Sequence, residues 1–175
     1  MKFLHMEKII LLVLVSLLFT SCGYRPSSKF SRAVLGEKIS TSVIISKEDP
    51  ENTVIIKDAV DSAIVERLQA SITSRVNSDS HLVFSISPPS FSPIQYDSNG
   101  YVIAYRMMIT LNITRYHAAK QKNYIAMGTH DFSITPNAVV TDQERFDAIK
   151  FSAAKAIEAF IAQVSSEGAR EEFTK

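Results

Sequence analysis

The chain has 175 residues, and its 19 Lys and Arg side chains against 18 Asp and Glu side chains give a net charge of +1 at neutral pH. A charge this close to zero argues against a nucleic-acid-binding protein, which would carry a clear excess of basic residues. The length and the 46% share of apolar residues fit one domain with a single hydrophobic core.

The N-terminus has the pattern of an export signal. Lysines precede an apolar run over residues 9–19, interrupted only by Ser16, which is shorter than the roughly 20 residues that a helix needs to span a membrane. We therefore predict a cleaved signal peptide over residues 1–21 and no membrane-spanning anchor. The signal carries two lysines and one glutamate, so the mature chain keeps 17 basic and 17 acidic side chains, and its net charge is zero.

This stretch resembles a bacterial lipoprotein signal, in which cleavage makes a cysteine the first residue and lipid is attached to its sulfur and amine. The resemblance implies lipidation of Cys22, and Gly23 in place of an aspartate implies delivery to the outer membrane. Cys22 is the only cysteine, so no intramolecular disulfide can form, and lipidation would remove a free thiol. Two or more acyl chains give stable anchoring. The alternative is that Cys22 is an incidental small apolar residue.

The next segments predict a tether, a strand and a helix. Residues 22–36 are polar and basic, and we expect them to link the lipid to a single α+β domain over residues 37–167. A short ordered arm that packs on the barrel or sheet of a partner is the alternative. Apolar and polar residues alternate over residues 38–46, which predicts a strand with one buried face. Apolar residues recur every four positions over residues 56–76, which predicts an amphipathic helix of about 20 residues.

The middle of the chain predicts three more strands. Residues 82–87 alternate, whereas the prolines of residues 88–93 cannot sit inside a paired central strand and predict a loop or a bulged edge. After a turn that ends in Asn-Gly, which is typical of hairpins, residues 101–116 have the clearest strand pattern. Residues 124–134 return beyond a polar tip, and a change of apolar phase near Gly128 predicts a β-bulge.

The end of the chain predicts a second helix and completes the fold class. A capping box over residues 141–144 begins this helix, which we expect to end at Gly168 and leave a charged tail over residues 168–175. The order strand, helix, strand, strand, strand, helix predicts an α+β two-layer sandwich, with a four-stranded, mostly antiparallel sheet and two helices packed on one face. Leu68 and Ile157 lie at the centres of the two apolar helix stripes, so we expect both in the core.

The sequence has no motif typical of a catalytic site. It contains no glycine-rich phosphate loop, no Gly-x-Ser-x-Gly and no His-Glu-x-x-His. His81, His117 and His130 do not have the spacing of metal ligands, with one another or with carboxylates. We therefore predict a protein that is not an enzyme, with no metal and no cofactor apart from the covalent lipid on Cys22.

Basic side chains gather toward the tip of the long hairpin. They are Arg106, Arg115, Lys120 and Lys122. Lys and Arg side chains in such a group are suited to contact an anion such as a lipid phosphate. The alternative is a solvated cluster that only protects the edge of the sheet from pairing with other strands.

Together these features resemble the lipopolysaccharide-assembly lipoprotein family LptE over most of the mature chain. The features are Cys22-Gly23-Tyr24 at the start, the early strand, the helix from residue 56, the long hairpin and the closing helix. The resemblance implies a lipid-anchored, periplasm-facing protein of the outer membrane that plugs the β-barrel of its partner LptD, helps that barrel assemble and binds lipopolysaccharide. Arg106, Arg115, Lys120 and Lys122 are then the candidate lipopolysaccharide contacts, an assignment made from their charge.

Another class of protein also fits these features. An auxiliary lipoprotein of an envelope lipid transporter of the ABC type, or a lipoprotein that activates a cell-wall synthase, would also be a small anchored α/β domain. The protein that co-purifies with the chain distinguishes the two classes.

We predict that Cys22→Ala abolishes acylation and leaves a precursor or a soluble product, because no other cysteine can accept the lipid. Metabolic labelling with a fatty-acid probe measures this. Equal labelling of the variant and the wild type would contradict the lipoprotein prediction.

Overall fold

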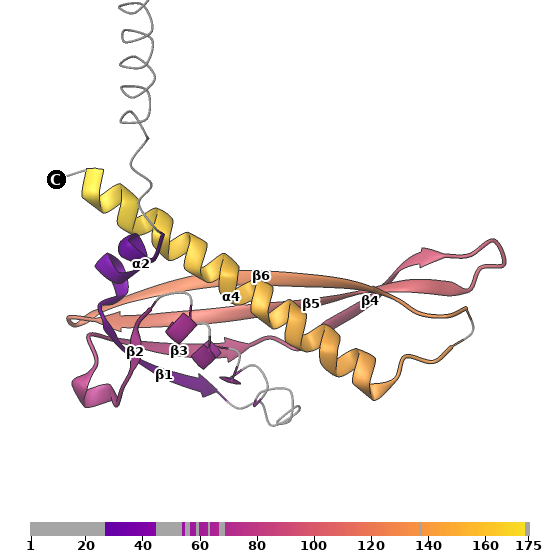
Figure 1. Ribbon diagram of the computed structural model, residues 1–175, viewed down its shortest axis with the longest axis horizontal. Coiled ribbons are helices and arrows are strands. Elements are labelled where there is room, and N and C mark those ends of the chain that lie inside the picture. The colour runs from indigo at the N-terminus through magenta and orange to yellow at the C-terminus, as the bar shows by residue number, and fades with distance from the viewer. Residues whose placement is uncertain are drawn as a thin grey trace, which may run out of the picture.

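The protein consists of a long, curled sheet with one long helix along its face (Figure 1). The computed structural model describes residues 27–44, 54, 57–58, 60–62, 64–66, 69–136 and 138–173. The predicted signal peptide and Cys22 lie outside the described residues. The described elements are α2 (Ser27–Leu35), β1 (Lys38–Ile44), β2 (Ser71–Ile72), 3₁₀-helix η1 (Arg75–Asn77), β3 (Ser80–Ile86), β4 (Ser90–Tyr96), β5 (Val102–His117), β6 (Lys120–Ser133) and α4 (Asp142–Phe173).

The sheet is built around β5. Strand β6 pairs with it antiparallel along one side, while β3 and β4 share the other side, also antiparallel. Beyond β3, strand β1 pairs in parallel, and β2 pairs in parallel with β1. The α+β class is confirmed, but the predicted four-stranded, mostly antiparallel sheet was wrong, because the described residues form a sheet of six strands with mixed directions.

Both additional strands lie at edges of the sheet, where a short or irregular strand is tolerated. The proline-rich segment forms β4, with register shifts on either side of Gln95, which confirms the predicted bulged edge. Pro93 fits there because an edge strand leaves the N–H groups of one side unpaired. Strand β2 comes from a segment that we predicted as the end of a helix.

The predicted helix over residues 56–76 is shorter in the structure. The described positions between residues 54 and 66 are helical, and Val60 and Ile64 of this helical segment are buried in the core. Leu68, the other residue expected in the core, lies outside the described residues.

Backbone pairing with β1 ends this helix early. Gln69 has a left-handed φ of 52°, and beyond it the N–H of Ser71 donates to the carbonyl of Glu37 at 2.8 Å. A four-residue apolar spacing is also a multiple of the two-residue repeat of a strand, so the same spacing fits both structures. Val76, expected on the buried face, is 94% exposed in the 3₁₀-helix.

Helix α2 occupies much of the segment that we predicted as a tether. Its residues Val34 and Leu35 are buried, and the helix packs against the C-terminal part of α4. Gly168 of α4 allows this contact, because the carbonyl oxygen of Phe30 lies where a side chain at that position would begin. The structure therefore differs from a tether over Ser27–Leu35, since an apolar helix face is buried there.

Helix α4 begins where the capping box predicts. The hydroxyl of Thr141 accepts from the N–H of Glu144 at 3.2 Å, and the Glu144 carboxylate accepts from the N–H of Thr141 at 2.8 Å. The expected end at Gly168 was wrong, because α4 continues to Phe173 and the glycine makes room for α2. None of the described helices is long and apolar enough to cross a membrane.

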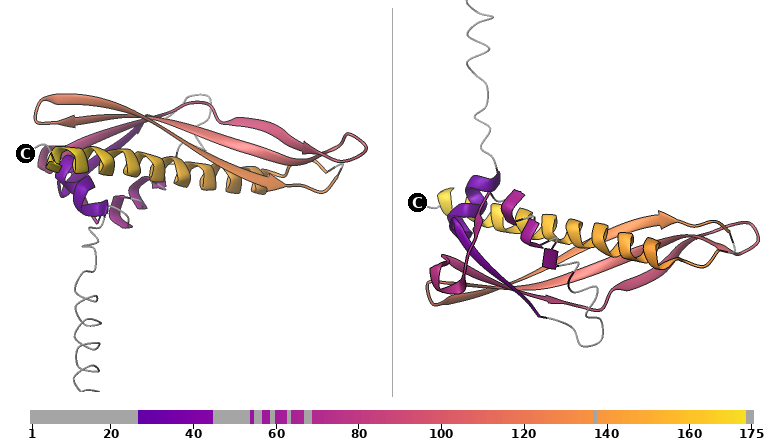
Figure 2. Two further views of the ribbon diagram at one scale, coloured as in Figure 1. Left: turned by 90° about the horizontal axis from the view of Figure 1, so that it is seen from above. Right: turned by 60° about the horizontal axis from the view of Figure 1, so that its bottom comes forward.

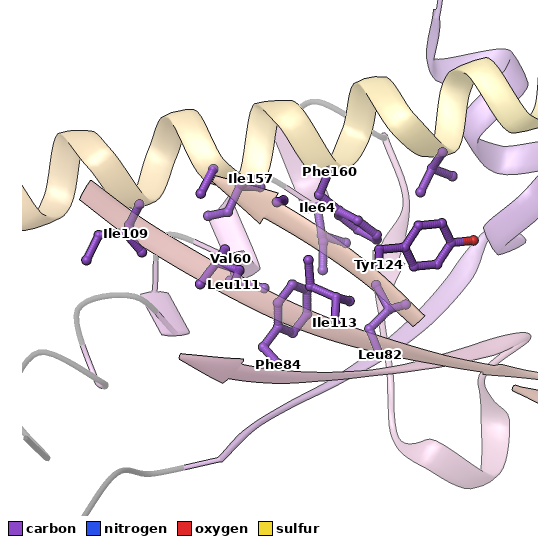
Figure 3. Close-up of a cluster of buried hydrophobic side chains, with 14 of the residues drawn as sticks. Val60, Ile64, Leu82, Phe84, Ile109, Leu111, Ile113, Tyr124, Ile157 and Phe160 are labelled. Atoms are coloured by element: carbon purple, nitrogen blue, oxygen red, sulfur yellow. The ribbon is translucent and has the colours of Figure 1, made fainter. Parts of the chain in front are cut away.

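The core lies between α4 and one face of the sheet, as Figure 3 shows. The ring of Phe160 from α4 meets Tyr124 and Phe84 edge-on, at centroid distances of 5.4 and 6.0 Å. The buried apolar residues that surround them include Leu82, Met107, Ile109, Leu111, Ile113, Ala126, Ile149, Ala153, Ala156, Ile157 and Val164. Burying one such large side chain contributes about 1.5–3 kcal/mol. The prediction of Ile157 in the core is confirmed.

Gly128 brings α4 directly onto β6. A Cβ at this position would collide with the backbone of α4 at Ser152 and Ala156. The predicted bulge was wrong, because β6 pairs with β5 without a register shift. The change of phase arises because Ile125 and Met127 lie on the opposite, open face of the sheet, where they are 63% and 59% exposed.

We predict that Gly128→Ala lowers the free energy of unfolding by about 1–3 kcal/mol, because the added methyl group forces the strand and the helix apart. Thermal unfolding measures the loss. Thr129→Ala, which changes a neighbouring exposed residue, is the matched control and should leave the melting temperature nearly unchanged. A Gly128→Ala variant as stable as the wild type would show that α4 does not contact β6 at this point.

Candidate functional site

The turn between β5 and β6 lies at the same end of the molecule as α2 and the C-terminus of α4, and Figure 2 shows this arrangement from two further sides. Ala118 and Ala119 form the turn, with φ of 45° and 62°. Two positive φ angles are typical of a tight type I′ turn, in which Asn-Gly is preferred because residues with a Cβ are strained there. The tip is therefore tight, and His117 and Lys120 pair directly on either side of it.

Arg115 is an internal residue of this end and does not project from it. Its side chain is only 13% exposed and lies between β5, α2 and α4. The guanidinium donates to the carbonyl of Val34 at 3.1 Å and to the carboxylate of Glu167 at 3.4 Å. Arg115 thus joins α2 to the sheet and balances the charge of Glu167.

Glu167 gathers three side chains of β5 and β6. Besides Arg115, it accepts from the hydroxyl of Tyr124 at 2.8 Å and pairs with the ammonium of Lys122 at 2.8 Å. Lys122 and Arg115 also lie 5.5 and 5.9 Å from the centroid of the Tyr124 ring, within the range of cation–π attraction. The carboxylate is nearly buried, whereas Lys122 is half exposed.

Burial and hydrogen bonding shift the pKa values of this cluster. Burial raises the pKa of Tyr124, and the hydrogen bond to Glu167 adds to the rise, so the phenol stays protonated as a donor. Burial also acts to raise the pKa of Glu167, but the hydrogen bonds from Lys122 and Tyr124 and the charge of Arg115 outweigh it, so this pKa is lowered. The folded state therefore favours an ionised Glu167.

An open groove of about 450 Å³ runs beside this cluster, between β6 and α4. It is lined by Lys122, Tyr124, Ala162, Gln163, Ser166, Glu167 and Arg170. Two of these side chains are basic and one is acidic, so the lining has a net positive charge. Lys and Arg donors beside polar groups suit an anionic oxygen, such as a phosphate or a carboxylate.

The structure brings together only part of the predicted basic group. Lys120 is exposed beside the turn, opposite His117, and Lys122 lies two residues further along β6. Arg106 lies nine residues before Arg115 on β5, about 30 Å away at the usual rise of a strand. It forms a two-bonded ion pair with Asp131, with both N–O distances 2.7 Å.

His81 and His117 form hydrogen bonds that do not involve the Glu167 cluster. His81 is buried, with Nδ1 2.8 Å from the hydroxyl of Ser40, and burial together with the charge of Arg75 lowers its pKa. Nδ1 of His117 lies 2.7 Å from the carbonyl oxygen of Asp79. Within the described residues, no group of histidine, cysteine and acidic side chains is placed to hold a metal.

Glu167 is the residue that sequence reasoning missed. It follows Val164 by three positions on α4, so it lies on the apolar stripe of the helix at a place where a second apolar residue would be expected. An acidic residue on a buried stripe predicts a basic or hydroxyl partner on the facing element. Which partner it meets depends on the tertiary packing of α4 against β5 and β6.

Comparison with known proteins gives a family and a fold. A family model described as "LptE: Lipopolysaccharide-assembly" matches residues 40–164. The solved structure of the rare lipoprotein B from Shewanella oneidensis is similar with a TM-score of 0.53 and 15% identity, over 77% of this chain and 98% of that chain. A hypothetical protein from Chlamydia trachomatis is similar with a TM-score of 0.50 and 7% identity, over 76% and 98%. These structures share the fold, and no curated protein sequence matches the chain.

We predict that Glu167→Gln lowers the free energy of unfolding by about 1.5–3 kcal/mol at neutral pH, because it removes charge-assisted hydrogen bonds. The pKa of Glu167 is lower in the folded than in the unfolded chain, so its contribution is present above the unfolded pKa and is lost as the pH falls through the folded one. The difference between variant and wild type should therefore shrink in acid. Unfolding titrations at several pH values measure it.

Glu171→Gln, on the exposed last turns of the same helix, is the matched control and should change little at any pH. A Glu167→Gln variant whose stability differs from that of the wild type by the same amount at every pH would show that the carboxylate is not the ionised partner in the cluster.

Proposed function

Because the chain belongs to the LptE family of lipopolysaccharide-assembly proteins, we propose that it is an outer-membrane lipoprotein that plugs the LptD β-barrel and assists lipopolysaccharide transport and assembly. The family match over residues 40–164 is the observation that carries this proposal. It includes most of α4 and the whole sheet except the first two residues of β1. In this proposal the lipid on Cys22 holds the domain at the periplasmic face of the membrane, and the protein acts by binding and not by catalysis.

The position of α2 supports an orientation at the membrane. Cys22 precedes Ser27, the first residue of α2, by five positions, so the chain between them reaches at most about 17 Å. Helix α2 packs beside the hairpin turn and the C-terminal end of α4. The lipid would therefore hold this end of the domain close to the membrane surface.

We further propose that Lys120 and Lys122 at this end contact lipopolysaccharide phosphates. Lys120 is exposed, Lys122 is half exposed, and both lie beside a tight turn. Arg115 and Lys122 share the carboxylate of Glu167, and Arg106 is too distant to belong to the same contact. A barrel lumen of low dielectric constant would strengthen each charge contact relative to open water.

Co-purification of the full-length lipoprotein from membranes of its own cells tests the proposed function. Recovery of a large outer-membrane barrel, in about the same molar amount as the lipoprotein, supports the proposal that the lipoprotein plugs the barrel. Recovery of an inner-membrane permease or of a cell-wall synthase, without a barrel, would replace the proposal by the transporter or synthase class.

We predict that the double variant Lys120→Ser/Lys122→Ser weakens lipopolysaccharide binding, and does so most at low salt, because ions screen exposed charge contacts. Its melting temperature should fall only slightly, because Lys122 is half exposed and Arg115 still pairs with Glu167 in the variant. Binding titrations of the purified protein at two ionic strengths measure the effect.

Arg106→Ser is the matched control, because it removes one exposed cation of the same sheet far from the turn. If the double variant binds lipopolysaccharide as tightly as this control at low salt, the lysines only protect the hairpin from edge pairing.

A further inference from the structure

Strand β6 forms a long, regular edge of the sheet. It pairs with β5 along one side over its 14 residues, and the pairing has no register shift. The other edges differ, since β2 has two residues, and β4 contains Pro93 and two register shifts. Natural proteins blunt their edge strands with such devices. Between residues 123 and 129, β6 has no proline, no charged residue and no bulge.

The hairpin turn determines which backbone groups of β6 point outward. A two-residue turn makes His117 and Lys120 a hydrogen-bonded pair, and such pairs alternate along an antiparallel ladder. Even-numbered residues of β6 therefore bond to β5, and the N–H and C=O groups of odd-numbered residues point outward. The side chain of Gln163 agrees with this assignment, because its Nε2 donates to the carbonyl of Ile125 at 2.8 Å from the outer side.

The surroundings of this edge leave room for an added strand. The groove between β6 and α4 runs along its first part, with Gln163 and Ser166 of α4 on the helix side. On the open face, Ile125 and Met127 are exposed apolar side chains directly at the edge. A neighbouring strand would cover both of them, would replace the Gln163 amide at the carbonyl of Ile125 and would accept from the N–H of Met127.

We propose that the outer edge of β6 accepts an extended strand of the barrel partner, which adds to the sheet through main-chain hydrogen bonds. The inference rests on the proposed function and specifies how the partner binds. Strand addition is a known mode of recognition, in which the backbone supplies the affinity and alternate side chains supply the specificity. The side chains of the incoming strand that face Ile125 and Met127 would be apolar.

A second copy of this chain does not fit the edge. Two copies paired antiparallel through β6 would carry α4 on the same face of a continuous sheet. Helix α4 lies directly over β6 at Gly128. Neighbouring strands are about 4.8 Å apart, whereas packed helices need about 8–10 Å between their axes, so the two helices would collide. The occupant must therefore be a strand without a helix above it.

The test uses Met127, whose N–H points outward. Met127→Pro in the full-length lipoprotein removes this donor and leaves the β5 ladder intact, since proline is tolerated on the free side of an edge strand. Met127→Ala shortens the same side chain and keeps the donor, so it is the matched control. We expect Met127→Pro to recover about tenfold less barrel on co-purification than Met127→Ala, with similar melting temperatures of the two purified chains.

Amide hydrogen exchange of the wild-type chain tests the inference without a substitution. In the free protein, the amides of Ala126 and Gly128 should exchange slowly, and those of Ile125, Met127 and Thr129 rapidly. In the complex with the barrel, the odd-numbered amides should slow at least tenfold. Odd-numbered amides that exchange equally fast in both states overturn the inference, while recovery of the barrel leaves the proposed function standing. A wild-type chain that recovers no barrel overturns both.

Discussion

The close approach of α4 to β6 at Gly128 is the contact on which the rest of the structure depends. With no side chain at this position, the helix backbone rests on the strand at the small residues Ser152 and Ala156. The larger side chains on either side then reach past the strand, so that Phe160 contacts Phe84 on β3. One long helix can thereby cover a sheet whose strands β5 and β6 are much longer than the other strands.

The position of α4 also assembles the basic end of the molecule. A 32-residue helix is about 48 Å long, close to the length of β5, so its last turns lie beside the hairpin turn. Glu167 is carried there, and its negative charge allows Arg115 to be nearly buried in an otherwise apolar region. Gly168, one residue later, gives α2 its place. The position of α4 thus determines three contacts: with β6 at Gly128, with Arg115 through Glu167, and with α2 at Gly168.

The sequence predicted those parts of the fold that local patterns determine. Strand β5 alternates over many residues, and the capping box of α4 depends on two residues three positions apart, so both were found. Strand β6 was predicted to contain a bulge because its inward residues include the small Ala126 and Gly128, while the apolar Ile125 and Met127 point outward. Helix α2 and the burial of Arg115 were not predictable, since each depends on a residue of α4 that is distant in the sequence. Lys120 and Lys122 at the turn were predicted because their charge is visible in the sequence without any knowledge of the packing.

The two turns that flank β5 differ in a way that bears on the order of folding. The turn before β5 has Gly100 at a φ of 86°, and the carboxylate of Asp97 accepts from the N–H groups of Asn99 and Tyr101. The turn after it places two alanines in the left-handed region, at about 1–2 kcal/mol each. We expect the β4–β5 hairpin to form early in folding and β6 to join late. Substitutions at Asp97 should therefore change the folding rate, whereas substitutions at Ala119 should mainly change the unfolding rate. The longest pairing of the sheet would then close together with the docking of α4, whose backbone packs on β6 at Gly128.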